Sequence, residues 1–197
     1  MMFDYDFIAL FFIIWSKMII LTGPSASGKT ELAKILLQKY NIQKVVTHTT
    51  RPIRHNEIDG IDYHFVSEKM FDTLKKQDAF VETTLYNQYH YGTSFKELGD
   101  HKVVTVDPNG LKVFVALNNP HYITFFIEAN EVTRINRMLI RGQDLAFAKQ
   151  RIAWDRVSFL PENLPPIDHV IDNESVTIEE AADTIHALYV DTLKARQ

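Results

Sequence analysis

The residues most able to do chemistry lie together in one short segment, residues 23–30. The segment reads Gly-Pro-Ser-Ala-Ser-Gly-Lys-Thr and matches the phosphate-loop pattern G-x-x-x-x-G-K-[ST]. Its two glycines allow successive backbone N–H groups to converge on a phosphate at the positive end of a helix. Lys29 is expected to reach the terminal phosphates, and the Thr30 hydroxyl to bind Mg²⁺. A plain strand-to-helix turn needs neither side chain. The segment therefore predicts a nucleoside triphosphate site made by Gly23, Pro24, Ser25, Ala26, Ser27, Gly28, Lys29 and Thr30.

The sequence around this segment supplies the strand and the helix that the motif needs. Residues 18–21 are a continuous apolar run typical of a buried strand, and residues 30–40 carry apolar side chains at helical spacing. Strand and helix patterns then alternate, which predicts an α/β fold with a parallel sheet covered on both faces. Further strands are expected at residues 44–48, 103–107, 123–127 and 169–171, and helices at residues 111–117, 132–140, 145–159 and 177–193. Thr177 and Glu180 form a capping-box pattern at the start of the last helix.

Residues 52–95 interrupt this alternation. Short aromatic-rich runs at residues 62–65, 79–82 and 89–93 are typical of small antiparallel strands. We therefore expect a separate mixed insertion at the carboxyl edge of the sheet, where α/β proteins bind ligands.

The insertion and the segment leading into it carry side chains suited to a phosphorylated acceptor. Arg51 and Arg54 are three residues apart on a proline-containing segment, and two guanidinium groups can hold a monophosphate dianion. Tyr63 and Tyr91 add hydroxyl donors, and Glu82 is a carboxylate within an apolar run. Taken singly, the arginines could be surface charges and the tyrosines could be core residues. The combination favours a binding site.

Composition and charge narrow the function classes. The chain has 197 residues, enough for one α/β domain with a core and an inserted subdomain. Its formal net charge of −4 argues against a general nucleic-acid-binding surface. The absence of cysteine excludes disulfides and thiolate metal sites, and fits a cytoplasmic location.

The amino terminus stands apart from this organisation. Residues 7–15 are consecutive apolar residues, too few to span a bilayer on their own. Two aspartates precede them, where a secretory signal would carry positive charge. We expect residues 1–17 to be an extension, either a disordered tail or a result of the choice between Met1 and Met18 as the start. A packed segment and an interfacial anchor are the alternatives.

Three further motifs give the chain a family resemblance. Residues 47–54 read Thr-His-Thr-Thr-Arg-Pro-Ile-Arg, residues 57–66 read Glu-Ile-Asp-Gly-Ile-Asp-Tyr-His-Phe-Val, and residues 91–94 read Tyr-Gly-Thr-Ser. In this order, and after the phosphate loop, they resemble the guanylate kinase family, P-loop enzymes that phosphorylate GMP at the expense of ATP. The resemblance extends to Asn173. These motifs together are highly specific.

The resemblance implies a transferase of purine nucleotide metabolism that uses ATP with Mg²⁺ and acts on GMP. It implies a P-loop NTPase-type core at residues 18–51 and 96–197, a GMP-binding insertion at residues 52–95, and a helical lid at about residues 137–151. The GMP phosphate would be held by Arg51, Arg54, Tyr63 and Tyr91, and the guanine edge would be read by Thr47, Glu82, Thr93 and Asp107. The transferred phosphoryl group would be covered by Arg137, Arg141 and Arg151, while Asn173 would contact adenine. Neither a nucleic acid nor, unless the amino-terminal run is an anchor, a membrane is expected as a partner. The oligomeric state is left open.

The chemistry of guanine supports the assigned base readers independently. Guanine offers adjacent N1–H and N2–H donors that the Glu82 carboxylate can accept together, and an O6 acceptor that the Thr93 hydroxyl can satisfy. Adenine reverses this polarity and would leave a buried carboxylate facing an acceptor. An unpaired buried polar group costs about 1–3 kcal/mol, and more when it is charged. The residues therefore favour guanine.

The lid arginines have a chemical role and a plain alternative. Arg137 and Arg141 are four residues apart, so that they share a face of the predicted helix. Positive charge closing over a transferring phosphoryl group stabilises its developing negative charge and expels water. Without the phosphate loop, a solvent-facing basic helix would explain the same spacing.

The chain departs from the family pattern after the third predicted strand, where the family has Asp-x-Asp-x-x-Gly. Residues 105–110 read Thr-Val-Asp-Pro-Asn-Gly, so that Thr105 replaces the first acid and Pro108 enters the turn. The lid is also one residue short between Arg141 and Arg151.

Two alternative functions therefore remain. One is a P-loop kinase of another phosphorylated acceptor, such as a ribosyl bisphosphate; Glu82 and Asp107 argue against it. The other is a non-catalytic guanylate-kinase-like binding module; the intact Lys29 and Thr30 argue against that one.

Overall fold

A computed structural model describes residues 16–54, 57–86 and 88–196. The expected amino-terminal extension therefore lies outside the described residues, except for its last two. Both of these are attached to the folded domain. The Ser16 hydroxyl lies 3.0 Å from the hydroxyl of Tyr122, and the Lys17 amide donates to Asp100 at 2.9 Å.

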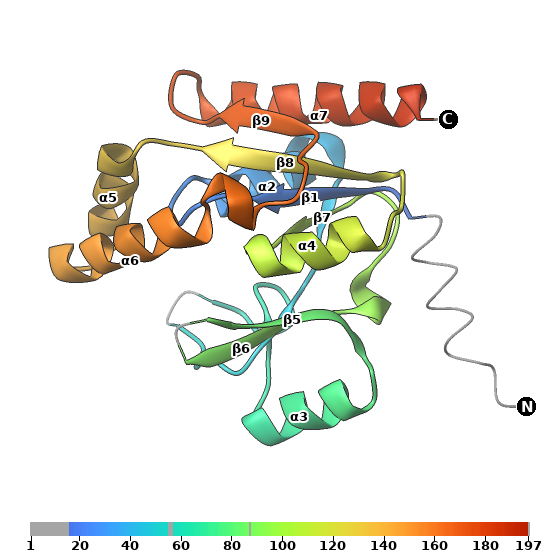
Figure 1. The fold of residues 1–197 in the computed structure, drawn as a ribbon, viewed down its shortest axis with the longest axis vertical. Helices are drawn as coiled ribbons and strands as arrows, with labels where there is room; N and C mark the ends of the chain where they lie inside the picture. Colours follow the sequence, from blue (N-terminus) through green and yellow to red (C-terminus); the bar gives the residue numbers. More distant parts are fainter. Residues whose placement is uncertain (1–15, 55–56, 87, 197) are drawn as a thin grey trace, which may run out of the picture.

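Five of the described strands form one parallel sheet in the order β2-β7-β1-β8-β9 (Figure 1). The central strand β1 (Met18–Thr22) pairs with β7 (Lys102–Thr105) on one side and β8 (Tyr122–Glu128) on the other. The edges are β2 (Gln43–Lys44) and β9 (His169–Asp172). This arrangement confirms the predicted α/β fold with a parallel sheet.

Helices cover both faces of this sheet, which explains the continuous apolar run of β1. Ile19 of β1 packs with α2 (Lys29–Tyr40) and α7 (Ile178–Ala195) in one core. Ile20 points the other way and packs with α4 (Pro108–Ala116) in a second core. The alternation of a strand thus divides β1 between two hydrophobic clusters.

Two further helices, α5 (Glu131–Ile140) and α6 (Leu145–Ser158), lie at the end of the sheet beside the phosphate loop (Figure 1). Each begins with a side-chain cap, supplied by Asn130 for α5 and by Asp144 for α6. Their contact forms a small third cluster, against which Ala26 of the phosphate loop packs. The helices are therefore attached directly to the loop. Short 3₁₀ turns occur at Phe95–Glu97 and Pro161–Asn163.

A second sheet has the order β4-β3-β6-β5. Its strands are β3 (His48–Thr49), β4 (His64–Phe65), β5 (Phe80–Tyr86) and β6 (Tyr89–Ser94). One helix, α3 (Glu68–Lys76), packs on it through the fully buried Phe71, whose ring lies 4.6 Å from that of Phe80. This sheet and α3 form a separate layer below the core sheet in Figure 1.

Two sequence predictions about these elements are corrected, and one helix was missed. A single strand over residues 44–48 is wrong, because Lys44 belongs to β2 in the core sheet whereas His48 pairs with Gly92 in the small sheet. The antiparallel prediction holds for β5 and β6, but β4 pairs parallel to β3. The helix α3, which Ser67 caps, was not predicted.

The turn after β7 also differs from the prediction. β7 ends at Thr105 rather than at Asp107, and Asp107 instead caps α4 by accepting from the Gly110 amide at 2.8 Å. Pro108 is the first residue of α4, a position that proline favours because its missing N–H has no helical partner there. The proline therefore begins a helix and does not distort the turn.

The capping box of Thr177 and Glu180 is confirmed at the start of α7. Within the ranges that the structure describes, every helix is too short or too polar to cross a bilayer.

Candidate active site

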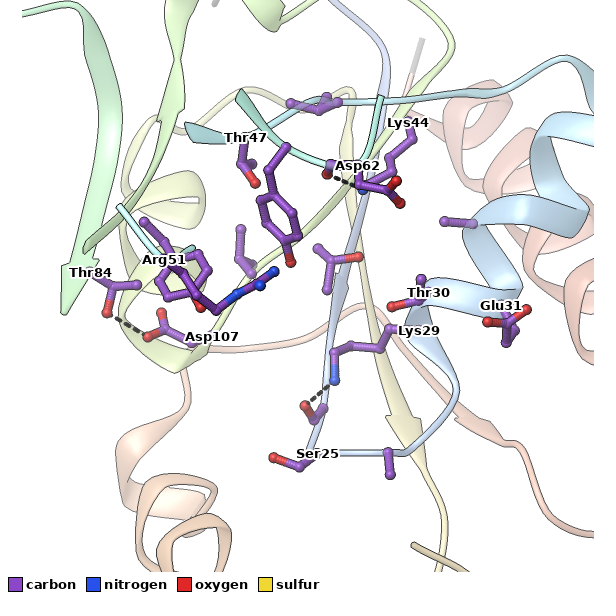
Figure 2. A pocket seen from close by; sticks show the side chains of 18 of the residues that line it. Ser25, Lys29, Thr30, Glu31, Lys44, Thr47, Arg51, Asp62, Thr84 and Asp107 are labelled. Carbon is purple, nitrogen blue, oxygen red and sulfur yellow. Dashed lines mark hydrogen bonds between the residues drawn. The ribbon is translucent and has the colours of Figure 1, made fainter. Parts of the chain in front are cut away.

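A cavity of about 470 Å³ is lined by residues from both sheets and from the helices beside the phosphate loop (Figure 2). The predicted site residues that line it are Gly23, Ser25, Ala26, Lys29, Thr30, Thr47, Arg51, Arg54, Tyr63, Glu82, Tyr91, Asp107, Arg141 and Arg151. The predicted residues outside this lining are Pro24, Ser27, Gly28, Thr93, Arg137 and Asn173. The structure therefore brings most of the residues expected to bind ATP and GMP to one cavity, but not all of them.

The glycines of the phosphate loop are required by backbone angle and by space. Gly28 has φ 111° and precedes α2, and a Cβ there would lie 2.0 Å from the side-chain nitrogen of Asn173. Gly23 has φ 142°, and its Cβ would lie 2.4 Å from the carbonyl oxygen of Ile127. Both angles disfavour residues other than glycine. The loop can take its shape only with these two residues.

Lys29 is directed along the inner side of the loop (Figure 2). Its ammonium group donates to the carbonyl oxygens of Gly23 at 2.7 Å and Pro24 at 2.9 Å. Burial lowers the pKa of Lys29 to about 8, although the carboxylate of Asp155 acts in the opposite direction. A lysine in this environment gains strongly from an anionic ligand.

Thr30, beside Lys29, presents its side chain to the cavity. In the described part of the chain, no three His, Asp or Glu side chains converge to hold a metal by themselves. Mg²⁺ commonly takes few protein oxygens and completes its shell with substrate phosphates and water. The hydroxyl of Thr30 therefore fits a metal that is bound mainly through a nucleotide.

Arg137 and Asn173 support the loop from outside the cavity. Arg137 donates to the carbonyl oxygens of Ser27 at 3.0 Å and Asn173 at 2.9 Å, and the Asn173 amide donates to Ser27 at 2.7 Å. Arg141 directly follows α5 as its carboxyl-terminal cap and lines the cavity instead. The two arginines that were expected to share a helix face therefore make different contacts.

Asp155 is a site residue that the sequence analysis missed. Its carboxylate accepts from the Ser25 amide at 2.9 Å, from the Ser25 hydroxyl at 3.1 Å and from Arg134 at 2.8 Å. Arg151 donates to the same Ser25 hydroxyl through two nitrogens, at 2.9 and 3.1 Å. Arg151 and Asp155 are four residues apart on α6, a spacing that would have revealed the shared face.

The predicted phosphate-binding arginines lie at the other side of the cavity. Arg51 is buried and pairs with Glu57, its Nη2 lying 2.7 Å from the carboxylate. Glu57 also accepts from the Arg54 amide at 2.9 Å. The Arg51 guanidinium lies 5.5 Å from the centre of the Tyr63 ring, which in turn is 6.0 Å from the Tyr91 ring. Glu57, to which the sequence analysis assigned no role, thus orients the Arg51 guanidinium and the backbone of Arg54.

Glu82 and Thr93 face each other across β5 and β6. The Thr93 hydroxyl donates to the Glu82 carboxylate at 2.6 Å. Glu82 is only 9% exposed, and this burial raises its pKa to about 7, with the neighbouring Asp107 adding to the effect. Asp107 accepts from Thr84 at 2.7 Å, a partner that the sequence analysis did not identify (Figure 2).

Lys44 connects the two sides of the cavity. It belongs to β2 of the core sheet, and its ammonium group donates to the carbonyl oxygen of Asp62 at 2.6 Å (Figure 2). The same group lies 5.0 Å from the centre of the Tyr63 ring. Lys44 was not predicted as a site residue.

Comparisons with known proteins show which family this chain is similar to. A protein-family model described as guanylate kinase matches residues 15–189. The guanylate kinase of Nitrosococcus oceani is 34% identical over 136 residues, which cover 65% of this chain and 66% of that protein. MAGUK p55 subfamily member 7 of Danio rerio is 32% identical over 140 residues, which cover 65% of this chain and 24% of that protein. The chain thus spans about two thirds of the first relative and a quarter of the second.

A solved structure is similar over nearly the whole chain. The guanylate kinase of Anaplasma phagocytophilum superposes with a TM-score of 0.65 at 24% identity, covering 92% of this chain and 88% of that one. At this identity the likeness concerns the fold.

Proposed function

Because the chain belongs to the guanylate kinase family, we propose that it transfers the terminal phosphoryl group of ATP to GMP. The observation that carries this proposal is that one cavity is lined both by the phosphate loop and by the arginine, tyrosine and carboxylate set of the small sheet. In-line transfer needs donor and acceptor phosphates in one water-poor space. A cavity that joins the two residue sets meets this requirement.

On the donor side, the phosphate loop binds the phosphates of ATP. Lys29 neutralises the terminal phosphates, and the Thr30 hydroxyl helps to hold Mg²⁺, which supplies further charge neutralisation when it is bound. Arg137 and Asn173 keep the loop in shape through the carbonyl oxygen of Ser27. We further propose that Asn173 contacts the adenine of ATP.

On the acceptor side, Arg51, Arg54, Tyr63 and Tyr91 bind the GMP phosphate. Glu57 holds Arg51 and the backbone of Arg54, so that the guanidinium is already oriented before it meets a phosphate. Orientation in advance lowers the conformational entropy lost on binding. Glu57 therefore contributes to GMP affinity without touching the ligand.

The guanine edge is read by Glu82, Thr93, Asp107 and Thr47. The Glu82 carboxylate accepts from guanine N1–H and N2–H. The Thr93 hydroxyl has one proton, which it donates to Glu82 in the free site and turns to O6 once guanine occupies the carboxylate. Asp107 is held by Thr84 and by the first turn of α4. These interactions let a buried site reject adenine, which would leave the carboxylate unpaired.

During transfer, Arg141 and Arg151 stabilise the negative charge that develops on the phosphoryl group. Arg151 is half-buried and already donates to Ser25 in the phosphate loop. Arg141 is exposed at the end of α5 and reaches the phosphoryl group by movement of the lid over residues 137–151.

We also propose a cytoplasmic location, as the sequence analysis predicts.

The direct test is a coupled assay for ADP release with GMP, dGMP, AMP, CMP and UMP as acceptors. We expect GMP to exceed AMP, CMP and UMP by at least about a hundredfold in kcat/KM, because a site of buried hydrogen bonds rejects ligands that leave them unmade. Lys29→Ala should abolish turnover and leave the fold intact. Normal turnover by folded Lys29→Ala protein would refute the kinase function altogether.

A second acceptor class is tested in the same assay. Thr105 stands where the family has an acid, which weakens the expected pattern at the base-reading edge. Adding a ribosyl bisphosphate to the panel distinguishes the alternative kinase. A preference for that acceptor over GMP would replace the proposal.

The match to MAGUK p55 subfamily member 7 favours one further candidate, a non-catalytic binding module, because the matching region is only part of that protein. The intact phosphate loop argues for catalysis. ATP binding without turnover on any acceptor would favour the module.

A further inference from the structure

Asp155 lies within the donor side of the cavity, and the proposed reaction gives it no role. Asp155 is 7% exposed and lines the cavity. The carboxylate accepts from both the amide and the hydroxyl of Ser25, a phosphate-loop residue. Phosphoryl oxygens and carboxylate oxygens are anionic acceptors that seek the same N–H and O–H donors. Asp155 therefore uses donors that a bound phosphate would also attract.

Three positive charges lie near Asp155, and two of them, Lys29 and Arg151, line the cavity that a triphosphate would enter. Arg134 donates to the carboxylate at 2.8 Å and is itself 4% exposed. Lys29 is close enough for the carboxylate to oppose the effect of burial on its ammonium group. Arg151 donates to the Ser25 hydroxyl that in turn donates to Asp155. The carboxylate thus lies inside the cation cluster of the donor site.

We propose that the Asp155 carboxylate and the terminal phosphate of the bound triphosphate compete for Ser25 and for the surrounding cations. Asp155 thereby weakens ATP binding and lowers the affinity for ATP relative to ADP, which lacks the terminal phosphate. When ATP binds, the carboxylate gives up the Ser25 amide and hydroxyl and keeps its ion pair with Arg134. Arg151 then turns from Ser25 to the phosphate. This inference rests on the proposed donor site and concerns its selectivity.

A purely structural role for Asp155 predicts the opposite effect on ATP affinity. If Asp155 only holds the phosphate loop in shape, its removal disturbs a loop that every bound nucleotide uses. ATP and ADP would then both bind more weakly. Competition predicts instead that ATP binds more tightly and that ADP changes little, so the ratio of the two affinities separates the roles.

The test variant is Asp155→Asn, which keeps the size of the side chain and one acceptor oxygen for Ser25 but removes the negative charge. Dissociation constants for ATP and ADP are measured by titration calorimetry with Mg²⁺ and without GMP. We expect the ATP constant to fall by about three- to tenfold, as for removal of a nearby charge in a partly solvated site, and the ADP constant to change by less than about twofold.

Glu131→Gln is the matched control. Glu131 on α5 accepts from Arg156 on α6 at 2.7 Å, so that this variant breaks an ion pair between the same two helices. Neither of these residues lines the cavity. We expect its ATP and ADP constants to match those of the unchanged protein. Circular dichroism on heating establishes that each variant is folded.

Asp155→Asn leaves the buried Arg134 charge without its ionic partner, which endangers the fold. The double variant Arg134→Met with Asp155→Leu replaces the pair by apolar side chains and keeps the test available. In either folded variant, unchanged or weaker ATP binding overturns the proposal, as does an equal gain for ADP. A protein that binds ATP but does not phosphorylate GMP would refute the proposed reaction, and the affinity ratio would still decide this inference.

Discussion

At the scale of single residues, two ionisable groups in the cavity have pKa values moved toward neutrality. Burial lowers that of Lys29 to about 8 on the donor side, and burial raises that of Glu82 to about 7 on the acceptor side. Each group is thereby prepared for a charged or strongly polar partner, because a ligand that favours the charged form reverses the effect of burial.

The pH dependence of GMP use follows from Glu82. Below about pH 7 its carboxyl is protonated and cannot accept two guanine N–H groups, so that lowering the pH weakens GMP binding. We expect the KM for GMP to rise about tenfold between pH 8 and pH 6, with a smaller rise for ATP. Steady-state kinetics over this range measure the effect.

Glu82→Gln is the control for that profile. Glutamine does not titrate, so the remaining dependence should be that of the GMP phosphate, whose second pKa lies near 6. The variant should also lose GMP activity steeply and keep its ATP affinity. Parallel profiles for the two proteins would show that Glu82 is not the titrating group.

Proton uptake on ATP binding follows from Lys29. At pH 9 a lysine with a pKa of about 8 is mostly neutral, and the phosphates of ATP favour its charged form. We expect nearly one proton to be taken up per ATP bound, measured by calorimetry in two buffers with different ionisation enthalpies. Lys29→Arg, whose guanidinium stays charged, should bind ATP without this uptake.

At the scale of elements, the sequence predicted the strands and helices whose burial pattern is contained in their own residues. The apolar run of β1 and the helical spacing of α2 were read correctly, because each element carries its whole burial pattern in its own residues. β2 and β3 have two residues each and exist only through remote partners, so that no local pattern separates them. The same limit applies to Asp155, whose contact with Ser25 depends on how α6 packs against the loop.

The junction between β1 and α2 gives a prediction for its glycine. Gly28→Ala adds backbone strain at φ 111° and a methyl group 2.0 Å from Asn173, which must be displaced from Ser27. We expect ATP binding to be lost and the melting temperature to fall. Titration with ATP and thermal unfolding measure the two effects.

Gly142→Ala is the control for Gly28→Ala, because it adds backbone strain without a steric clash. Gly142 has φ 80°, but a Cβ there meets no atom within 4 Å. It should cost about 1–2 kcal/mol of folding stability from backbone strain and leave ATP affinity unchanged. Equal loss of ATP binding in the two variants would contradict the importance of Asn173 for the loop.

At the scale of the whole molecule, Lys44 joins β2 of the core sheet to the turn before β4 of the small sheet. Lys44→Met keeps the apolar stem but removes the ammonium group that holds the Asp62 carbonyl oxygen beside Tyr63. We expect the KM for GMP to rise several-fold, because Tyr63 loses a support, while the KM for ATP stays within about twofold. Lys34→Met, which removes an exposed ammonium group from α2, is the control. A matching rise in the two KM values would contradict this coupling.

The order of strands in the core sheet has a consequence for how the chain reaches its native state. β1 lies between β7 and β8, whose first residues pair with Met18 from positions 102 and 122. β5 and β6, by contrast, are adjacent in sequence and pair as a hairpin. Contacts between distant residues form slowly, because a long loop must close first, whereas hairpins form within microseconds. During synthesis the small sheet can therefore assemble before the sheet that carries the phosphate loop is complete.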